Sequence, residues 1–257
     1  MPKLDLLLFA DYSQIEYRLF AWYMAEQVGD RQAVEAYKSG KDFHEETAKR
    51  MLEATGKTYS TPLTDAERQV GKTGNFAAIY SGGTPTIQRQ LGCSQSVARE
   101  LADAFHGQYP LLGRWAWRGR GFSDPDPHTL NGQIVSRLRE RGYISTLWGR
   151  HLHPLEDRKA LNALVQGGAA DLMKASMVRL ARAMVGMESH MVLSVHDEIG
   201  FDVREGELPA LLELVPEAMC DEPVLTAVIP LAVDMKMSYD NWADAKEVEC
   251  PTTLTVS

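Results

Sequence analysis

The 257-residue sequence contains only three cysteines, and they lie far apart. They form no Cys-x-x-Cys pair and their number is odd, which argues against a disulfide framework and against a zinc knuckle. No apolar run approaches the roughly 20 residues that a membrane-spanning helix needs. The early run Leu6–Ala10 is short and lies between Asp5 and Asp11, so it is typical of a buried strand. These absences predict a cytoplasmic protein without a membrane partner.

The sequence also lacks the basic excess that is common in nucleic-acid-binding proteins. It contains 27 Lys and Arg residues but 35 Asp and Glu residues, and the formal net charge is −8. The charge is uneven, because residues 111–160 contain nine basic and five acidic residues, whereas residues 186–257 contain three and fifteen. The middle of the chain could therefore form a cationic surface, although such arginines also suit a solvated helix face.

Strand-like runs lie towards both ends of the chain, and helical patterns fill the middle. We expect strands at residues 4–10, 191–195, 199–203 and 227–235, and long helices at residues 64–80 and 159–187. Thr64 and Glu67 have the spacing of a capping box, which is typical of a helix start. This order of elements predicts the α+β class, with a mixed or antiparallel sheet.

Carboxylates stand where the strand-like runs end. Asp11 follows the first run, and His196, Asp197 and Glu198 separate two later runs. A carboxylate in a turn usually serves the turn alone, but this turn contains no Gly, Asn or Pro. If the strands pair side by side, Asp11 and Asp197 come close together and repel each other unless cations lie between them. Such a pair suits two Mg²⁺ ions about 3.5–4 Å apart, as in phosphoryl transfer.

Two cations and two aromatic rings follow each other at intervals of four residues. Arg68, Lys72, Phe76 and Tyr80 therefore form one row along a helix. The row could be a half-buried face on which two long side chains snorkel to water. It could also bind a nucleotide, with the cations on the triphosphate and the rings stacked on the base. The order of phosphate, sugar and base in a nucleotide matches the order along the helix.

Five motifs together resemble the C-terminal polymerase region of family A DNA polymerases, the bacterial DNA polymerase I type. The resemblance extends from about residue 4 to residue 246. Its motifs are the segment Asp11–Arg18 (DYSQIEYR), the row from Arg68 to Tyr80, the segment Gly142–Arg150, the segment Asn162–Asp171, and His196-Asp197-Glu198. One such motif is modest evidence, whereas five in the same order are hard to obtain by chance.

The resemblance implies an antiparallel palm sheet with a mainly helical fingers subdomain. The implied divisions are palm at 1–23, fingers at 24–140 and palm again at 141–257. The implied activity is template-directed transfer of dNTPs to a primer 3′-hydroxyl by two Mg²⁺ ions, on primer–template DNA. No thumb or exonuclease motif is visible, so we expect a protein partner that supplies the thumb and the upstream palm. The alternative is a compact polymerase that acts alone, with low DNA affinity and low processivity. Replication, for example of a phage or plasmid, and repair are both open.

The resemblance also implies roles for individual residues. Those implied to be catalytic are Asp11, Lys72, Asp197 and Glu198, and the metal ligands would be Asp11, Asp197 and the Tyr12 carbonyl. The dNTP would contact Gln14, Glu16, Arg68, Lys72, Phe76 and Tyr80, with Glu16 excluding a ribose 2′-hydroxyl. Template and primer would contact Asn162, Gln166 and His196.

Two alternatives compete with a polymerase. The chain could be a non-catalytic DNA-binding or assembly subunit derived from a polymerase, but such a relic would be free to lose Glu16 and Lys72. It could also be an unrelated helical nucleotide-binding domain, which leaves the His-Asp-Glu hairpin unexplained. The sequence departs from the family where Gln69 replaces a second basic residue, and where Ser81-Gly82-Gly83 follows the motif tyrosine.

Overall fold

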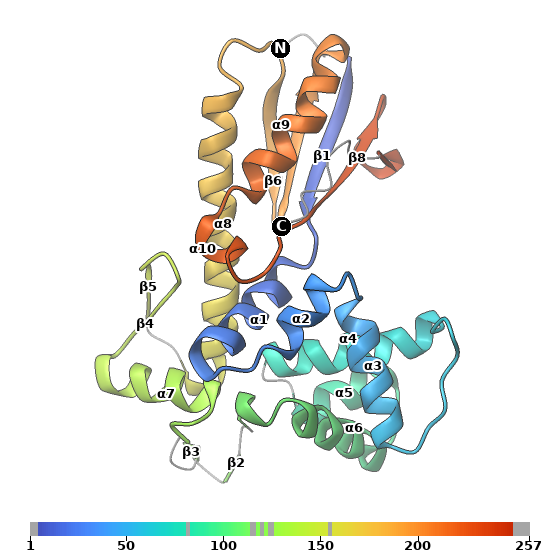
Figure 1. Ribbon diagram of the computed structural model, residues 1–257, viewed down its shortest axis with the longest axis vertical. Helices are drawn as coiled ribbons and strands as arrows, with labels where there is room; N and C mark the ends of the chain where they lie inside the picture. The colour runs from blue at the N-terminus through green and yellow to red at the C-terminus, as the bar shows by residue number, and fades with distance from the viewer. Residues whose placement is uncertain are drawn as a thin grey trace. The chain divides into compact units, whose positions relative to one another are not determined.

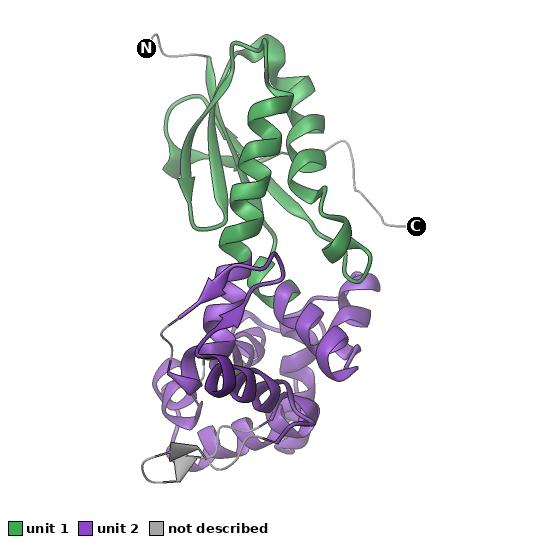
Figure 2. Ribbon diagram, turned by 90° about the vertical axis from the view of Figure 1, so that its left-hand side faces the viewer, with its two compact units in different colours: residues 1–18, 169–257 green, residues 19–168 purple. Residues whose placement is uncertain are grey.

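The structure is a computed structural model that describes residues 5–80, 83–113, 117–118, 121–122, 126–153 and 156–248. It combines helices with a five-stranded antiparallel sheet, which confirms the predicted α+β class. The chain divides into unit 1, residues 1–18 and 169–257, and unit 2, residues 19–168 (Figure 2). The predicted boundaries of palm and fingers are functional divisions that these units do not test. Among the described residues, no helix is long and apolar enough to cross a membrane.

Unit 1 contains the sheet, in which the strands lie in the order β6-β7-β1-β8-β9 (Figure 1). Their bounds are β1 Leu6–Tyr12, β6 His190–Val195, β7 Glu198–Val203, β8 Val233–Ser238 and β9 Lys246–Glu247. The prediction of a last strand at 227–235 is wrong at both ends, because β8 begins at Val233 and ends at Ser238. Residues before β8 include the short helix α10 (Pro223–Thr226) and Pro230, which has no N–H to donate to a ladder.

Helices make up most of the remaining structure. Their bounds are α1 Ile15–Val28, α2 Gln32–Lys38, α3 Phe43–Ala54, α4 Asp65–Ile79, α5 Gly83–Leu91, α6 Gln95–Gln108, α7 Leu130–Arg141, α8 Ala160–Ala183 and α9 Leu208–Cys220. Two small ribbons pair β2 (Trp117–Arg118) with β3 (Gly121–Phe122), and β4 (Ile144–Ser145) with β5 (His151–Leu152). Ser81 and Gly82, where the sequence departs from the family pattern, lie outside the described residues.

The two faces of the sheet differ in character because side chains alternate along each strand. On β1, Leu8, Ala10 and Tyr12 point to a fully buried face. The Tyr12 hydroxyl lies 2.6 Å from Ser176 Oγ of α8 and donates to the Met219 carbonyl of α9, so these two helices cover that face. The opposite face of β1 carries the half-buried side chain of Asp11.

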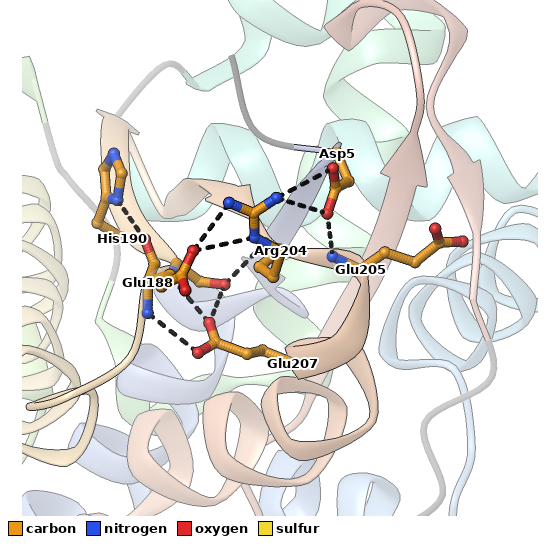
Figure 3. A network of polar contacts seen from close by, with 7 residues as sticks. Asp5, Glu188, His190, Arg204, Glu205 and Glu207 are labelled. Atoms are coloured by element: carbon orange, nitrogen blue, oxygen red, sulfur yellow. Dashed lines mark hydrogen bonds and ion pairs between the residues drawn. The ribbon is translucent and has the colours of Figure 1, made fainter. Parts of the chain in front are cut away.

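An ion-pair network fixes the ends of the sheet strands in unit 1 (Figure 3). Arg204 comes directly after β7. Its Nη1 atom lies 3.4 Å from Asp5 Oδ2, and its Nη2 atom lies 2.8 Å from Glu188 Oε2. Glu207 accepts hydrogen bonds from the backbone N–H groups of Glu188 and Ser189 at 3.0 and 2.8 Å. Exposed pairs of this kind contribute up to about 1 kcal/mol each. The network ties the start of β1 and the loop before β6 to the end of β7.

In unit 2, helix α4 packs on α3 through glycines. A Cβ atom at Gly71 would lie 2.0 Å from the His44 carbonyl oxygen, and one at Gly74 would lie 2.6 Å from Met51 Sδ. The same contact holds a buried polar pair, in which the Asn75 side-chain amide lies 3.0 Å from His44 Nδ1. Burial lowers the pKa of His44 to about 4, so its imidazole is neutral at pH 7. The glycines thus set the position of α4, which carries the cation and aromatic row.

Candidate active site

Carboxylates from three strands meet on one face of the unit 1 sheet. β1 pairs with β7 and β8, and the register places Asp11 opposite Glu198 on one side and opposite Asp234 on the other. The Tyr12 N–H donates to the Asp197 carbonyl at 3.1 Å, which joins the end of β1 to the hairpin turn. The pairing predicted from the sequence therefore exists, and it gathers carboxylates at the ends of these strands.

The carboxylates are held in an environment that disfavours their charge. Asp11 Oδ1 and Glu198 Oε1 are buried and have no hydrogen-bond partner among the described residues. Burial first, and then repulsion by Asp197, Glu198 and Asp234, raises the pKa of Asp11 to about 6, while Lys236 opposes the shift. Burial also raises the pKa of Glu198. Oxygen atoms that lack donors and repel one another fit a divalent cation.

The donor set also indicates which kind of cation fits. Among the described residues, no group of three or more His, Cys, Asp and Glu side chains is arranged to hold a metal on its own. Mg²⁺ does not need such a cage, because it is commonly bound by one or two carboxylates together with waters and substrate phosphates. Asp11 and Asp197, with the Tyr12 carbonyl, could therefore hold Mg²⁺ when a phosphate substrate is bound.

Sequence reasoning missed the contribution of β8 to this site. Asp234 is exposed and Lys236 is half-buried, and both lie on the face of the sheet that carries Asp11. Lys236 lowers the pKa of Asp11 and Glu198, so it acts as a fixed positive charge beside the carboxylates. The sequence does show charged residues at alternate positions of residues 233–238. This alternation could not be assigned to one face of a strand, because the start of β8 was predicted at the wrong residue.

Two turns of the site have an unusual backbone. Among the described non-glycine residues, only Gln14 and His196 have positive φ, at 56° and 55°. This left-handed conformation costs a residue with a Cβ atom about 1–2 kcal/mol. It explains how the turn between β6 and β7 closes without a glycine. Both residues are among the predicted site residues, and strained conformations of this kind cluster at functional sites.

Relief of this strain gives a testable prediction. We expect His196→Gly to be more stable than His196→Ala by about 1 kcal/mol, because glycine adopts positive φ without a steric cost. Both variants lose the imidazole, so their difference isolates the backbone. Urea denaturation of the two proteins provides the measurement. An alanine variant as stable as the glycine variant would show that the turn is not strained.

In unit 2, helix α4 begins as predicted. Glu67 accepts the Thr64 N–H at 2.7 Å and Thr64 Oγ1 accepts the Glu67 N–H at 3.3 Å, which is a capping box. Lys72 is exposed. The rings of Phe76 and Tyr80 stack on each other, with centroids 4.1 Å apart and planes 13° apart. A nucleobase would therefore meet an aromatic pair rather than two separate rings.

Arg68 has a partner that the sequence did not reveal. Its Nε and Nη2 atoms donate to Asp42 Oδ2 at 3.0 and 2.6 Å. Asp42 also caps α3, because its Oδ1 accepts the backbone N–H groups of His44 and Glu45. Burial would raise the pKa of Asp42, but Arg68 and these N–H groups outweigh it and lower the pKa. Arginine presents five N–H donors, so this contact orients the guanidinium and uses only part of it.

Helix α8 carries the predicted template and primer residues of unit 2. Gln166 Nε2 donates to the Tyr80 hydroxyl at 3.2 Å, which links α8 to the aromatic pair. Asn162 Oδ1 is buried without a hydrogen-bond partner among the described residues. Gly167 and Gly168 allow close packing, because a Cβ atom at Gly167 would lie 3.0 Å from Leu152. The Arg150 guanidinium donates to the Gly167 carbonyl at 2.6 Å, so the Gly142–Arg150 segment is anchored on α8.

The remaining predicted residues lie at the start of α1. Glu16 is half-buried in the first turn of this helix, directly after the left-handed turn at Gln14. Arg18 is buried and donates to the Ser13 carbonyl at 2.7 Å and to the Pro230 carbonyl.

Paired carboxylates on one face of an antiparallel sheet, next to strained turns, are the kind of site that metal-dependent phosphoryl transfer uses.

Comparison with known proteins agrees with this kind of site. The model of DNA polymerase family A matches residues 1–244. The chain therefore belongs to DNA polymerase family A. It is 32% identical to DNA polymerase I of Synechocystis sp. over 277 aligned residues, which cover 96% of this chain and 25% of the relative. It is 30% identical to the thermostable DNA polymerase I of Thermus aquaticus, covering 94% of this chain and 27% of that protein.

A solved structure is also similar. The POL domain of Pol1 from M. smegmatis, in complex with DNA primer-template and dNTP, matches with a TM-score of 0.73 and 28% identity. The match covers 93% of this chain and 41% of that chain. The chain thus spans about a quarter of the length of the curated relatives that it matches.

Proposed function

We propose that this chain carries the catalytic part of a DNA-directed DNA polymerase, which adds dNTPs to a primer 3′-hydroxyl under the direction of a template. The observation that carries the proposal is the pairing of Asp11 with Glu198 across two strands, with a buried oxygen of each side chain lacking a donor. The similarity to a POL domain solved with primer-template and dNTP supports the same conclusion.

The carboxylates of unit 1 would serve the reacting phosphate. Asp11 and Asp197, with the Tyr12 carbonyl, would hold two Mg²⁺ ions, and Glu198 would assist from the neighbouring strand. Bound there, Mg²⁺ would neutralise charge on the attacking and leaving oxygens. The primer 3′-hydroxyl would lose its proton to solvent water, its oxygen would bond to the α-phosphorus, and the bond from that phosphorus to the bridging oxygen of the β-phosphate would break, so that pyrophosphate leaves. The chain contributes mainly position and electrostatic stabilisation.

The residues of unit 2 would serve the nucleotide and the template. Arg68 and Lys72 would hold the β- and γ-phosphates, and the Lys72 ammonium would neutralise the charge that develops on pyrophosphate. Phe76 would lie against the sugar and base, and Tyr80 near the template base. The residues proposed to contact template or primer are Asn162, Gln166 and, in unit 1, His196. The contact of Gln166 with Tyr80 supports a shared role in positioning the template base.

Glu16 is proposed to exclude ribonucleotides. We expect Glu16→Ala to raise the ratio of ribonucleotide to deoxynucleotide incorporation roughly 10–100-fold, because the wall that meets the 2′-hydroxyl is lost. Competition assays with matched rNTP and dNTP measure the ratio. Glu26→Ala, an exposed glutamate of the same helix, serves as the control and should leave the ratio unchanged. An unchanged ratio in Glu16→Ala would remove Glu16 from the sugar site.

The proposal includes a protein partner that supplies the thumb and the upstream palm, in the cytoplasm of a bacterial cell. One observation supports such a partner beside unit 1. The edge strand β6 has no Lys or Pro, and exposes Val192 and Leu193. Unprotected edges of this kind accept another strand.

Primer extension tests the proposed function. The purified chain, alone and with candidate partners, is incubated with a labelled primer–template, dNTPs and Mg²⁺. We expect extension that disappears with EDTA and in Asp197→Asn. If no combination extends the primer although the chain binds DNA, the chain is a non-catalytic DNA-binding or assembly subunit and the proposal is wrong.

A further inference from the structure

The side chain of Asp42 joins the start of helix α3 to Arg68 on helix α4. Asp42 Oδ1 accepts the backbone N–H groups of His44 and Glu45, at 2.7 and 3.1 Å. Asp42 Oδ2 accepts two hydrogen bonds from Arg68, from Nε at 3.0 Å and from Nη2 at 2.6 Å. One oxygen of the carboxylate therefore caps α3 while the other binds the guanidinium. The roles proposed above include Arg68 but not Asp42.

The ion pair engages only one edge of the Arg68 guanidinium. Both of its hydrogen bonds end on the same carboxylate oxygen, and they use the N–H of Nε and one N–H of Nη2. Asp42 does not engage the remaining three N–H groups, which lie along the other side of the planar fork. The Arg68 side chain is 35% exposed. A phosphate can therefore accept hydrogen bonds from the second edge while Asp42 holds the first.

Packing between α3 and α4 fixes the place of the ion pair. A Cβ atom at Gly71 would lie 2.0 Å from the His44 carbonyl oxygen, so the two backbones are in close contact. One turn further along α4, Asn75 Oδ1 accepts a hydrogen bond from Thr47 Oγ1 at 3.2 Å, and the Asn75 amide lies 3.0 Å from His44 Nδ1. The last three side chains are buried. The carboxylate that binds Arg68 is thus carried by a rigid pair of helices.

Two opposite consequences for ligand binding follow from such a pair. A free arginine side chain loses rotamer freedom when it binds a ligand, and a guanidinium that is already held has lost much of it beforehand. The carboxylate could instead compete with a phosphate for the same guanidinium. The geometry favours the first consequence, because Asp42 occupies one edge of Arg68 and leaves the other open.

We propose that Asp42 is a positioning residue for nucleotide binding: it holds one edge of the Arg68 guanidinium so that the other edge can bind the triphosphate. The inference rests on the proposed function, in which Arg68 holds the β- and γ-phosphates. Removal of the charge on Asp42 distinguishes positioning from competition. If Asp42 positions Arg68, nucleotide binding becomes weaker, whereas if Asp42 competes with the phosphates, binding becomes tighter.

Asp42→Asn separates the two contacts of the carboxylate. Asparagine caps a helix about as well as aspartate does, but its NH₂ group donates and cannot accept from Arg68. We expect KM for dNTP in primer extension to rise about five- to tenfold, with kcat unchanged within a factor of about two, because the lost charge-assisted contact acts in binding. In an Arg68→Gln background, which lacks the guanidinium, the same change should raise KM less than about twofold.

Ser94→Ala is the matched control for the loss of a helix cap. Ser94 caps α6 in the same unit, where its Oγ accepts the Val97 N–H at 3.3 Å. We expect this variant to lower the midpoint of urea unfolding and to leave KM for dNTP unchanged. A KM that rises as much in Ser94→Ala as in Asp42→Asn would overturn the positioning role, because a general loss of stability would then explain both.

Binding of inorganic tripolyphosphate tests the inference without polymerase activity. Calorimetric titration in Mg²⁺ should give a Kd that is about five- to tenfold higher for Asp42→Asn than for the wild-type chain. This result supports the positioning role even if no combination of proteins extends a primer, in which case the proposed function fails separately. A Kd that is unchanged or lower in Asp42→Asn, or a wild-type chain that does not bind tripolyphosphate, would overturn it.

Discussion

Asp11→Asn is expected to abolish nucleotide transfer and, at the same time, to make the metal-free chain more stable at pH 7. Asp11 is one of the proposed metal ligands, so the loss in kcat should be roughly 10³-fold or more, the scale on which electrostatic contacts at a reacting centre act. Stability should move the other way, because the folded chain holds this carboxylate beside other carboxylates and away from water.

The sign of the stability effect follows from the raised pKa. The pKa of Asp11 is about 6 in the fold against an ordinary value of 3.8, so the fold favours the protonated form. The contribution of Asp11 to stability therefore falls as the pH rises from about 4 to about 6, and the full cost is present at pH 7. Asparagine cannot ionise, and we expect a gain of about 1–2 kcal/mol after allowance for partial solvent screening.

Urea denaturation in EDTA at pH 7 and at pH 4 measures this effect. The gain of Asp11→Asn should be present at pH 7 and nearly absent at pH 4, where the folded wild type is already protonated at Asp11. Glu213→Gln removes an exposed carboxylate of α9 in the same unit and should change stability by less than about 0.5 kcal/mol. A less stable Asp11→Asn at pH 7 would mean that the carboxylates are not in repulsive contact.

The second large effect is expected at Gly71. Alanine usually stabilises a helix relative to glycine by about 0.5–1 kcal/mol. Here the new Cβ atom would meet the His44 carbonyl oxygen at 2.0 Å and the Ala48 backbone nitrogen at 2.6 Å. Backbone atoms of α3 cannot move aside as a flexible side chain could. We therefore expect Gly71→Ala to destabilise the chain by about 3 kcal/mol or more, and to displace the row from Arg68 to Tyr80.

Gly107→Ala is the matched control for this prediction. Gly107 lies in helix α6, and a Cβ atom there would meet nothing within 4 Å. The control should therefore be neutral or stabilising by up to about 1 kcal/mol, as helix propensity alone predicts. Chemical denaturation of both variants decides the question. A Gly71→Ala protein as stable as the control would show that α3 and α4 are not in close backbone contact.

The local part of the site was predictable from the sequence. Asp11 could be placed near Asp197 because each stands at the end of an apolar strand and paired strands align their ends. The register then pairs Asp11 with Glu198, the residue after Asp197. The start of α4 was predictable because Thr64 and Glu67, which cap the helix, are only three residues apart in the sequence. Strands and helices leave such local patterns in the sequence, since apolar residues recur about every second residue in a strand and about every fourth residue in a helix.

The parts that depend on distant contacts were not predictable. Asp234 and Lys236 were missed because the start of β8 depends on where the chain leaves α10, not on the apolar content of residues 227–235. The pair of Arg68 with Asp42 joins two helices, and no spacing along one helix reveals it. From the sequence, the Gly167-Gly168 pair is expected to destabilise helix α8. In the structure, the missing side chain at Gly167 lets Leu152 pack closely, and the Gly167 carbonyl accepts a hydrogen bond from Arg150.

Incorporation of a single nucleotide opposite each of the four template bases tests the central claim most directly. Four primer–templates that differ only in the templating base are offered each dNTP separately, with Mg²⁺ and with the candidate partner where one is needed. We expect the chain to add only the complementary nucleotide, and Asp197→Asn to add none. Addition that ignores the template base, or no addition by the wild-type chain under any condition, would contradict it.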